Sequence, residues 1–326
     1  MADPDLDLLF DAEFPPGDVL FANADWHNTM GPLANRLWCL QDWKPAADRL
    51  STRNLRLGSP KAPVATALVR LGRQRARNLF NIAQALASLG PGGRLRVAGR
   101  NEIGPARYAK DLAAIGLVPI ATSKGKARRL DATVTGPLDL AAWTGETAER
   151  PILDGRFVSA PGIFAWDRID AGSAALAALL PTDLAGHVAD LGAGFGYLAA
   201  TALAQSPAIE RLDAFEADRP AVRCAAANLS AFGARAQARW HDVTAGVGAA
   251  LYDAVLTNPP FHEAHGEDRS LGLRFIDVAA DALKPGGRLY LVANRHLPYE
   301  QKLDARFKRV VRLHEGNGFK VYAAWA

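Results

Sequence analysis

The sequence has few cysteines and no long apolar run. Its two cysteines, Cys39 and Cys224, lie far apart, which argues against a disulfide framework and against a zinc site built on cysteine pairs. No apolar run approaches the roughly 20 residues that a membrane-spanning helix needs. Met1 to Asp7 is acidic, so no basic segment precedes an apolar one as in a signal peptide. We therefore expect a soluble, cytoplasmic protein with no membrane contact and no bound metal.

The sequence does contain enough apolar material for two ordinary domains. It has 326 residues, of which 49% are hydrophobic and 22% charged, and one domain takes about 150 residues on average. We expect two α/β domains, residues 1–150 and 151–326, with the boundary between Thr144 and Arg156.

Positive charge is concentrated in one stretch. Arg70 to Leu130 holds 13 Lys or Arg against two acids, a net of +11, which leaves −7 for the rest of a chain that carries +4 in all. Such a block favours a surface that faces a polyanion, although a solvated basic face without a partner is an equal alternative. If the block does bind RNA, we expect the contacts at Arg73, Arg75 and Arg77.

The C-terminal half alternates strands and helices, which is typical of a parallel sheet with helices on both faces. We expect strands at 187–191, 211–215, 236–240, 252–257 and 288–293, helices at 197–205, 220–232 and 271–283, and a final strand pair around 316–318. Lys284-Pro285-Gly286-Gly287 is expected to end the third helix, because Pro and Gly interrupt helices strongly.

The N-terminal half carries a weaker copy of this pattern. Residues 87–100 align with residues 281–294, each as a helix end, a Pro-Gly-Gly turn and a strand that opens with Arg-Leu. Arg70-Leu71-Gly72 stands where the second copy has Asn258-Pro259-Pro260, and the first copy has no glycine-rich turn. We infer a related, degenerate copy that has lost its chemistry and gained positive charge; chance recurrence of the turn is the alternative.

A glycine-rich motif, residues 190–196, lies between a predicted strand and a predicted helix. In that context glycines let a ligand approach the backbone, and the helix presents its first N–H groups. Tyr197 stands where a dinucleotide fingerprint requires glycine, which disfavours NAD. Asp190, just before the turn, suits a cationic ligand such as S-adenosylmethionine (SAM), which has an ammonium and a sulfonium group. The predicted contacts in this motif are Asp190, Gly192, Gly194 and Gly196.

Two further acids end the next two predicted strands. Glu216, twenty residues after Gly196, is placed to accept hydrogen bonds from both ribose hydroxyls of a nucleoside. Asp242 can accept from the exocyclic amine of adenine, although an aspartate at a strand end is often only a helix cap. Together with the glycine motif, these acids predict a nucleoside cofactor.

The most specific motif is Asn258-Pro259-Pro260-Phe261-His262 at the end of a predicted strand. Two prolines fix φ and remove two N–H groups, so their carbonyls and the Asn258 amide oxygen can accept both protons of a flat exocyclic amine. Phe261 can stack on the base. We predict that residues 258–261 are catalytic and that His262 is a supporting hydrogen-bonding residue. The structural alternative is a rigid strand exit.

These motifs resemble class I SAM-dependent amino-group N-methyltransferases. The wider pattern is similar to the ribosomal RNA guanine-N2 methyltransferases, and the resemblance is dense over residues 156–326. The residues that carry it are Pro161-Gly162-x-Phe164, Asp170-x-Gly172-Ser173, Asn258-Pro259-Pro260-Phe261, Val292-Ala293-Asn294 and Phe319-Lys320-Val321-Tyr322.

The resemblance implies a Rossmann-like methyltransferase sheet, preceded by a cofactor-free methyltransferase-like domain. It implies SAM as cofactor and a guanine N2 amine as the target, with small-subunit ribosomal RNA favoured. It places one group of residues around the methionine end of SAM, namely Phe164, Asp170, Gly172 and Ser173. It places Asn294 and Lys320 at the rim of the target cleft.

Other targets and another class of function remain open at this stage. Adenine in DNA and glutamine in protein present the same kind of planar amine, and a non-catalytic RNA assembly factor could keep SAM as a structural ligand. The basic block favours nucleic acid over protein, and the intact Asn258-Pro259-Pro260-Phe261 argues against a non-catalytic factor. Because one chain holds both modules, we expect a monomer that acts on ribosomal RNA or a ribosomal subunit.

Overall fold

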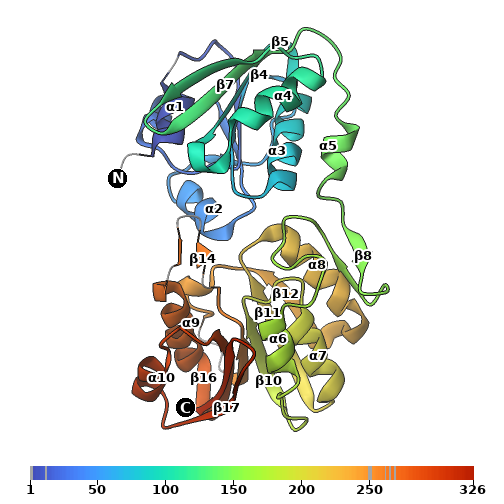
Figure 1. The fold of residues 1–326 in the computed structure, drawn as a ribbon, viewed down its shortest axis with the longest axis vertical. Helices are drawn as coiled ribbons and strands as arrows, with labels where there is room; N and C mark the ends of the chain where they lie inside the picture. Colours follow the sequence, from blue (N-terminus) through green and yellow to red (C-terminus); the bar gives the residue numbers. More distant parts are fainter. Residues whose placement is uncertain (1–2, 12, 249–251, 261, 264–265, 268) are drawn as a thin grey trace. The chain divides into compact units, whose positions relative to one another are not determined.

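A computed structural model of the protein describes residues 3–11, 13–248, 252–260, 262–263, 266–267 and 269–326, and it gives only the backbone of residues 262, 263, 266, 267 and 269. The chain divides into two compact units, Met1–Ala148 (unit 1) and Glu149–Ala326 (unit 2), which Figure 1 shows in blue to green and in green to red. In the described part of the chain, no helix is both long enough and apolar enough to cross a membrane.

Unit 2 is built on a seven-stranded sheet with the order β12-β11-β10-β13-β16-β18-β17. The first five strands are parallel, as predicted. The last two strands form the predicted hairpin around Asn317 and Gly318. Strand β18 of this hairpin also pairs with β16, and that pairing is antiparallel as well. The bounds are β10 Gly186–Leu191, β11 Ile209–Glu216, β12 Ala236–Trp240, β13 Tyr252–Thr257, β16 Leu283–Asn294, β17 Arg309–Gly316 and β18 Phe319–Trp325.

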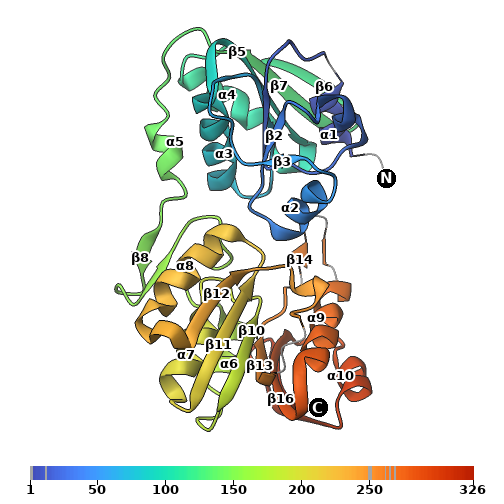
Figure 2. The same ribbon diagram turned by 180° about the vertical axis from the view of Figure 1, so that it is seen from behind.

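Helices cover both faces of this sheet, as Figures 1 and 2 show. On one face Leu176 and Leu198 pack on Val188 in one core, and on the other Phe275 and Ile276 belong to a second core. The central strands β10 and β13 are mostly apolar in their buried parts, because both of their faces are covered. The helices are α6 Ala171–Ala177, α7 Tyr197–Gln205, α8 Arg219–Leu229, α9 Arg269–Ala282 and α10 Glu300–Arg306, with short 3-10 turns η3 Ser230–Arg235 and η4 Val243–Ala245.

The Pro-Gly-Gly segment does not separate helix from strand as expected. Helix α9 ends at Ala282, and β16 begins at the next residue. The pairing of β16 with β13 shifts register between Leu283 and Arg288. Residues 284–287 therefore form an irregular excursion within the strand, and Gly286 supplies the positive φ of +79° that the excursion needs.

Unit 1 repeats the same architecture. Its sheet has the order β3-β2-β1-β4-β5-β7-β6, which matches the strand order of unit 2 position by position. The predicted related copy is therefore present, and it extends over three strands before Val64. The bounds are β1 Val19–Ala22, β2 Leu37–Leu40, β3 Arg56–Leu57, β4 Val64–Arg70, β5 Leu89–Arg100, β6 Ile120–Lys124 and β7 Ala127–Thr133, with α1 Pro4–Phe10, η1 Asn28–Leu33, α2 Lys44–Ser51, α3 Arg75–Ala87, η2 Asn101–Ile103, α4 Ala106–Ala114 and α5 Ala141–Gly145.

The remaining described elements are short. Strands β8 Arg150–Ile152 and β9 Phe157–Ser159 form an antiparallel pair at the start of unit 2, and β14 His262–Glu263 pairs with β15 Gly266–Glu267. Cys39 and Cys224 are buried thiols, one in each unit. Burial raises the pKa of Cys39 to about 12, so this thiol is not a nucleophile at neutral pH.

Candidate active site

The predicted site residues gather where the strand order of unit 2 reverses, between β10 and β13. In an open α/β sheet the carboxyl ends of the strands leave a crevice at such a point. Leu191 and Thr257 end these two strands and are register partners. The hydroxyl of Thr257 donates a hydrogen bond to the carbonyl of Leu191 at 2.8 Å, which joins the two strand ends below the crevice.

The three glycines of the turn have positive φ angles, +77° at Gly192, +57° at Gly194 and +89° at Gly196. A Cβ at Gly192 would lie 3.2 Å from the ring of Phe275, and one at Gly196 would lie 3.3 Å from Ala225. Those two glycines are therefore also needed for packing. A Cβ at Gly194 would meet no atom within 4 Å, so this position opens the turn toward a ligand.

Asp190 lies fully buried at the end of β10. Its Oδ2 accepts a hydrogen bond from the backbone N–H of Ala199 in α7 at 3.1 Å. Its Oδ1 has no hydrogen-bond partner among the described residues. Burial raises the pKa of this carboxyl to about 7, and the nearby Glu216 also raises it. The side chain thus anchors α7, and a cation beside the turn would favour its charged form.

Glu216 lies at the end of β11, beside the glycine turn. Its Oε2 accepts from the backbone N–H of Gly194 and its Oε1 from that of Asp218, both at 2.8 Å. Burial raises the pKa of Glu216, although the backbone hydrogen bonds act in the opposite direction. Each carboxylate oxygen can accept a second hydrogen bond, so the pair can hold two vicinal hydroxyls.

Two other predicted cofactor contacts, Asp242 and Phe164, differ in whether their side chains already make contacts within the protein. Asp242 caps the 3-10 turn η4, and its Oδ1 accepts from both the N–H and the hydroxyl of Thr244. Asp242 is therefore a helix cap, as the alternative interpretation of the sequence predicted, and its Oδ2 is left for a ligand. Phe164 is 62% exposed, so a face of its ring is open to contact.

Asn258 leaves the end of β13 and meets the start of α6. Its Nδ2 donates to Oδ2 of Asp170 at 2.8 Å and to Oγ of Ser173 at 2.9 Å. Asp170 caps α6 by accepting from the N–H of Ser173 at 2.9 Å. Pro259 is buried and Pro260 is partly buried. Phe261 lies outside the described residues, and of His262 only the backbone is described.

The predicted cofactor contact Gly172 and the predicted rim residues Asn294 and Lys320 differ in their surroundings. Gly172 is buried against Phe319, whose Cε1 would lie 2.9 Å from an added Cβ, so glycine is required there by packing. Asn294 ends β16 at the same edge of the sheet as Asn258. Lys320 contradicts the prediction: its side chain is 8% exposed, and its Nζ binds Glu300 and the carbonyl of Leu297.

The Lys320 ion pair is a structural element of unit 2. Burial alone would raise the pKa of Glu300, but hydrogen bonds from Lys320 and from the hydroxyl of Tyr322 outweigh burial and hold that pKa below its usual value. The lysine charge is therefore neutralised inside the fold. Lys320 has no charge to offer at the surface, and we withdraw its assignment to RNA contact.

The structure also corrects the expectation of one basic surface along residues 70–130. Many of its arginines form ion pairs with acids that lie mostly outside this stretch in sequence. Arg75 binds Asp111 through two contacts of 2.8 and 2.9 Å, and Arg77 lies 3.7 Å from Asp42. Only Arg73 of the three predicted arginines is exposed without an ion pair in the described residues. The paired basic residues are Arg70, Arg75, Arg77, Arg96, Arg100 and Arg129.

Asn228 is a site residue that the sequence did not reveal. From α8 its amide accepts from the N–H of Val158 at 2.7 Å and donates to the carbonyls of Val158 and Phe195 at 2.9 and 2.8 Å. It therefore ties β9 to the glycine turn. A single asparagine in an amphipathic helix carries no sequence signal for such a role.

Unit 1 has a counterpart of this site. Strand β1 pairs with β4 in the register in which β10 pairs with β13, since Val19 faces Thr66 as Val188 faces Ala254. Each position of one strand thus corresponds to a position of the other. Counting along β4 from these pairs places Arg70 at the position of Asn258 in unit 2, which agrees with the sequence alignment.

In unit 1 the protein's own side chains fill this position. Arg70 donates through Nη2 to Asp3 at 2.8 Å, through Nε to Asp5 at 2.9 Å and through Nη1 to Asp25 at 3.2 Å. By the same register, Asp25 stands at the position of Gly194. The guanidinium therefore occupies the space at this strand end, held by three carboxylates.

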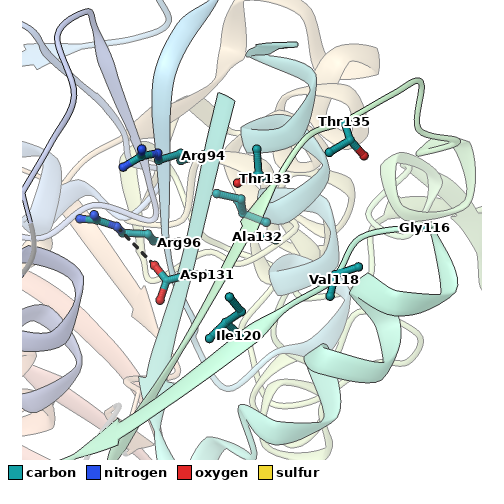
Figure 3. Close-up of a pocket in the computed structure, with 10 residues that line it drawn as sticks. Arg94, Arg96, Gly116, Val118, Ile120, Asp131, Ala132, Thr133 and Thr135 are labelled. Atoms are coloured by element: carbon teal, nitrogen blue, oxygen red, sulfur yellow. Dashed lines mark ion pairs between the residues drawn. The ribbon is translucent and has the colours of Figure 1, made fainter. Parts of the chain in front are cut away.

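A hollow of about 370 Å³ lies elsewhere in unit 1. Figure 3 shows Arg94 and Arg96 on one strand, with Arg96 directed toward Asp131, while Val118 and Ile120 lie on the other side. Val118 and Ile120 are 82% and 69% exposed. None of the residues that line this hollow is a predicted site residue, so it is separate from the candidate active site.

The chain is similar to known methyltransferases. The family model "Methyltransferase small domain" matches residues 154–323. Ribosomal RNA small subunit methyltransferase C of Pseudomonas aeruginosa is 32% identical over 294 residues, which cover 86% of this chain and 83% of that protein. The protein of the same name from Chromohalobacter salexigens is 36% identical over 273 residues, which cover 81% of this chain and 79% of that one.

A solved structure is similar over almost the whole chain. It is the T. thermophilus 16S rRNA N2 methyltransferase (RsmC) in complex with AdoMet and guanosine. The TM-score is 0.81 at 27% sequence identity, and the match covers 99% of this chain and 92% of that one. The likeness therefore includes both units, whereas the family model covers only the second.

Proposed function

Starting from the fact that the chain belongs to the ribosomal RNA small subunit methyltransferase C family, we propose that its second unit methylates the exocyclic N2 amine of a guanine in ribosomal RNA, with SAM as donor. The observation that carries the proposal is the Asn258 amide, pinned at the strand-order reversal beside the glycine turn. An acceptor fixed there meets a target amine at the edge where the cofactor binds.

The residues present fit SAM. Gly194 leaves open space above the turn, and Glu216 offers two oxygens to the ribose hydroxyls. Phe164 presents an exposed ring, and Asp170 is the acid next to Asn258 that suits the ammonium group. We assign these residues to cofactor binding together with the predicted Gly172, Ser173, Asp190, Gly192, Gly196 and Asp242.

In this mechanism the protein orients the target amine and the methyl donor and removes water from around them, and no protein side chain forms a covalent bond with either. SAM supplies an electrophilic methyl group, so that as guanine N2 bonds to the methyl carbon the carbon–sulfur bond breaks, the sulfonium becomes a neutral thioether and N2 loses a proton to water. The Asn258 Oδ1 and the carbonyls of the Pro259-Pro260 segment accept hydrogen bonds from the two N–H groups of the amine and turn the nitrogen lone pair toward the methyl donor. Such alignment can contribute up to roughly 7–11 kcal/mol.

The base must leave its stack to reach this crevice, as in other enzymes that modify bases. Asn294 ends β16 at the same sheet edge as Asn258, and we keep it as a contact at the rim. We place Phe261 against the flat face of the base.

We assign RNA binding to unit 1, at a surface that we call the α3–α4 basic surface: Arg73, Arg75, Arg107 and Lys110. The guanidinium groups of Arg75 and Arg107 lie 5.6 and 5.2 Å from the ring centre of Tyr108. Arg107 and Lys110 are three residues apart on α4 and therefore share a helix face. Of this set, Arg73, Arg107 and Lys110 are exposed and have no ion pair in the described residues.

Charge reversal tests this surface. We expect Arg73→Glu with Lys110→Glu to weaken binding to ribosomal RNA and to reduce the slope of log affinity against log salt by about 1 for each lost phosphate contact. The matched control is Lys124→Glu with Lys126→Glu on the β6–β7 hairpin, which changes net charge equally. Equal losses in both variants would show that only net charge matters and would contradict the assignment.

The reaction itself is tested by mapping the product. Labelled SAM is offered to ribosomal RNA, ribosomal subunits, DNA and protein, and modified nucleosides are identified by mass spectrometry. N2-methylguanosine in ribosomal RNA is expected, and Asn258→Ala should abolish it while SAM still binds. Label found only in DNA or protein would overturn the proposal. We further propose that the protein is a monomer and that it acts in the cytoplasm. Light scattering tests the monomeric state, and a dimer would contradict it.

A further inference from the structure

We propose that Asp170 and Ser173 are positioning residues that fix the amide of Asn258 so that its oxygen, and not its NH2 group, faces the target amine. This inference rests on the proposed function of the site. It gives Asp170 a task in addition to any contact with the cofactor, and it explains why the residue at position 258 is an amide.

The contacts use both protons of the amide. Nδ2 of Asn258 donates one hydrogen bond to Oδ2 of Asp170 at 2.8 Å and another to Oγ of Ser173 at 2.9 Å. The three residues come from two elements that are distant in sequence, the end of β13 and the start of α6. With both N–H groups engaged, rotation of the amide would break two hydrogen bonds at once.

The chemistry of Asp170 decides which way the amide faces. An ionised carboxylate accepts hydrogen bonds and donates none, so only the NH2 end of Asn258 can lie against it. A flipped amide would set two oxygens 2.8 Å apart. Because the amide group is planar, Oδ1 then points away from α6 as an acceptor. An exocyclic amine donates protons, so an acceptor is what the target requires.

Asp170 is itself held in place. It caps α6 by accepting from the N–H of Ser173 at 2.9 Å, and α6 packs closely on the sheet because Gly172 has no side chain. A Cβ there would approach Phe319 to 2.9 Å and Asp170 Oδ2 to 3.1 Å. The packing of α6 therefore determines the position of the carboxylate, and the carboxylate determines the amide.

It follows that positions 170 and 258 are coupled. An aspartate at 258 could also accept from the target amine, but it would set a second carboxylate against Asp170. Two like charges at this distance destabilise each other or force one to bind a proton, and a protonated oxygen is a poorer acceptor. Asp170 thus excludes an acid at position 258.

A double-mutant cycle tests the coupling. We expect Asn258→Asp to lower kcat by about 100-fold, as removal of an oriented polar group does in other enzymes. Asp170→Asn alone should lower it less. The double variant should recover about tenfold or more over Asn258→Asp, because an amide at 170 can donate to an acid at 258. Circular dichroism and thermal melting show whether each variant is folded, and SAM affinity is measured separately by calorimetry.

Ser173→Ala gives a second measurement that does not alter charge. Loss of one hydrogen bond to the amide should lower kcat, measured at saturating SAM, by about threefold to tenfold, with recovery in Ser173→Thr. Ser230→Ala, which removes a hydroxyl bound to the carbonyl of Ala227 elsewhere in unit 2, is the control and should not change kcat.

The outcomes separate this inference from the proposed function. If Asn258→Ala keeps full activity, the proposed role of the site fails. If Asn258→Ala is inactive but the effects at 170 and 258 multiply independently, with no recovery in the double variant, the site stands and the positioning role is overturned. A loss in Ser173→Ala that appears only in SAM affinity would likewise contradict positioning.

Discussion

Gly192 and Gly194 of the glycine turn differ in the space that is available for a side chain. A Cβ at Gly192 would press on Phe275, whereas one at Gly194 would enter open space. We therefore expect Gly194→Ala to cost only the backbone strain of a left-handed residue, about 1–2 kcal/mol. Its methyl group would nevertheless occupy the space that we assign to SAM, so SAM affinity should fall sharply. Calorimetric titration with SAM and thermal melting measure the two effects.

Gly286→Ala is the matched control for that variant. Gly286 also has a positive φ, +79°, and open space around a Cβ, but it lies in the excursion of β16. The backbone strain should be similar and SAM affinity unchanged. If both alanine variants bind SAM as the unchanged protein does, Gly194 does not face the cofactor.

Among the elements, helix α1 of unit 1 depends on charge as well as apolar packing. Asp3 and Asp5, at its start, bind Arg70, and the carbonyls of Leu8 and Leu9, near its end, accept from arginines of the sheet. These contacts attach a seven-residue helix, too short to be stable alone, to β4, β5 and β7.

We expect Arg70→Met to destabilise unit 1 by about 3 kcal/mol, because Asp3, Asp5 and Asp25 lose the cation that they share and keep only their contacts with Arg100 and Arg49. Arg70→Lys should be intermediate, since lysine keeps the charge but lacks the planar fork. Urea denaturation measures the change, and Arg94→Met at an exposed position is the control. A loss no larger than that of the control would mean that the cluster contributes nothing to stability.

For the whole molecule, the filled strand end of unit 1 predicts the cofactor stoichiometry. Arg70 and Asp25 occupy the positions that correspond to Asn258 and Gly194, so only unit 2 has room for a ligand there. We expect one SAM per chain by isothermal titration calorimetry.

The two units offer matched variants for this measurement. Glu216→Ala should remove all detectable binding. Gln41→Ala, at the corresponding position of unit 1, should leave binding unchanged. A stoichiometry of two would show that unit 1 also takes the cofactor, and binding that survives Glu216→Ala with unchanged affinity would show that Glu216 does not hold it.

Much of the fold of unit 2 follows from its sequence, because apolar strands and amphipathic helices alternate with clear Gly and Pro punctuation. The helix at 197–205 and the strands at 236–240 and 252–257 have the predicted bounds. Strands β1, β2 and β3 of unit 1 were not predicted, since they are short and their turns lack glycine motifs.

Charge was the least predictable property, because ion pairs join residues that are distant in sequence. The block at residues 70–130 is strongly basic in sequence, yet Arg70 in β4 pairs with Asp3 and Asp5 at the start of α1, and Arg129 pairs with Asp11. Lys320 likewise reads as a surface lysine but pairs with Glu300 inside the fold. Asn258 was predicted as an acceptor from its motif, whereas its contact with Asp170 depends on tertiary packing.

Because the two sheets have the same strand order, a strand of one unit could pair wrongly, during folding, at the equivalent position in the sheet of the other unit. The pairing of β5 with β7 sets Arg96 opposite Asp131, whereas the corresponding pair of unit 2 is Tyr290 with Ala323. A strand exchanged between the sheets would carry Arg96 or Asp131 into a position without its counter-ion. Charge complementarity thus favours self-recognition of each half and penalises hybrid sheets.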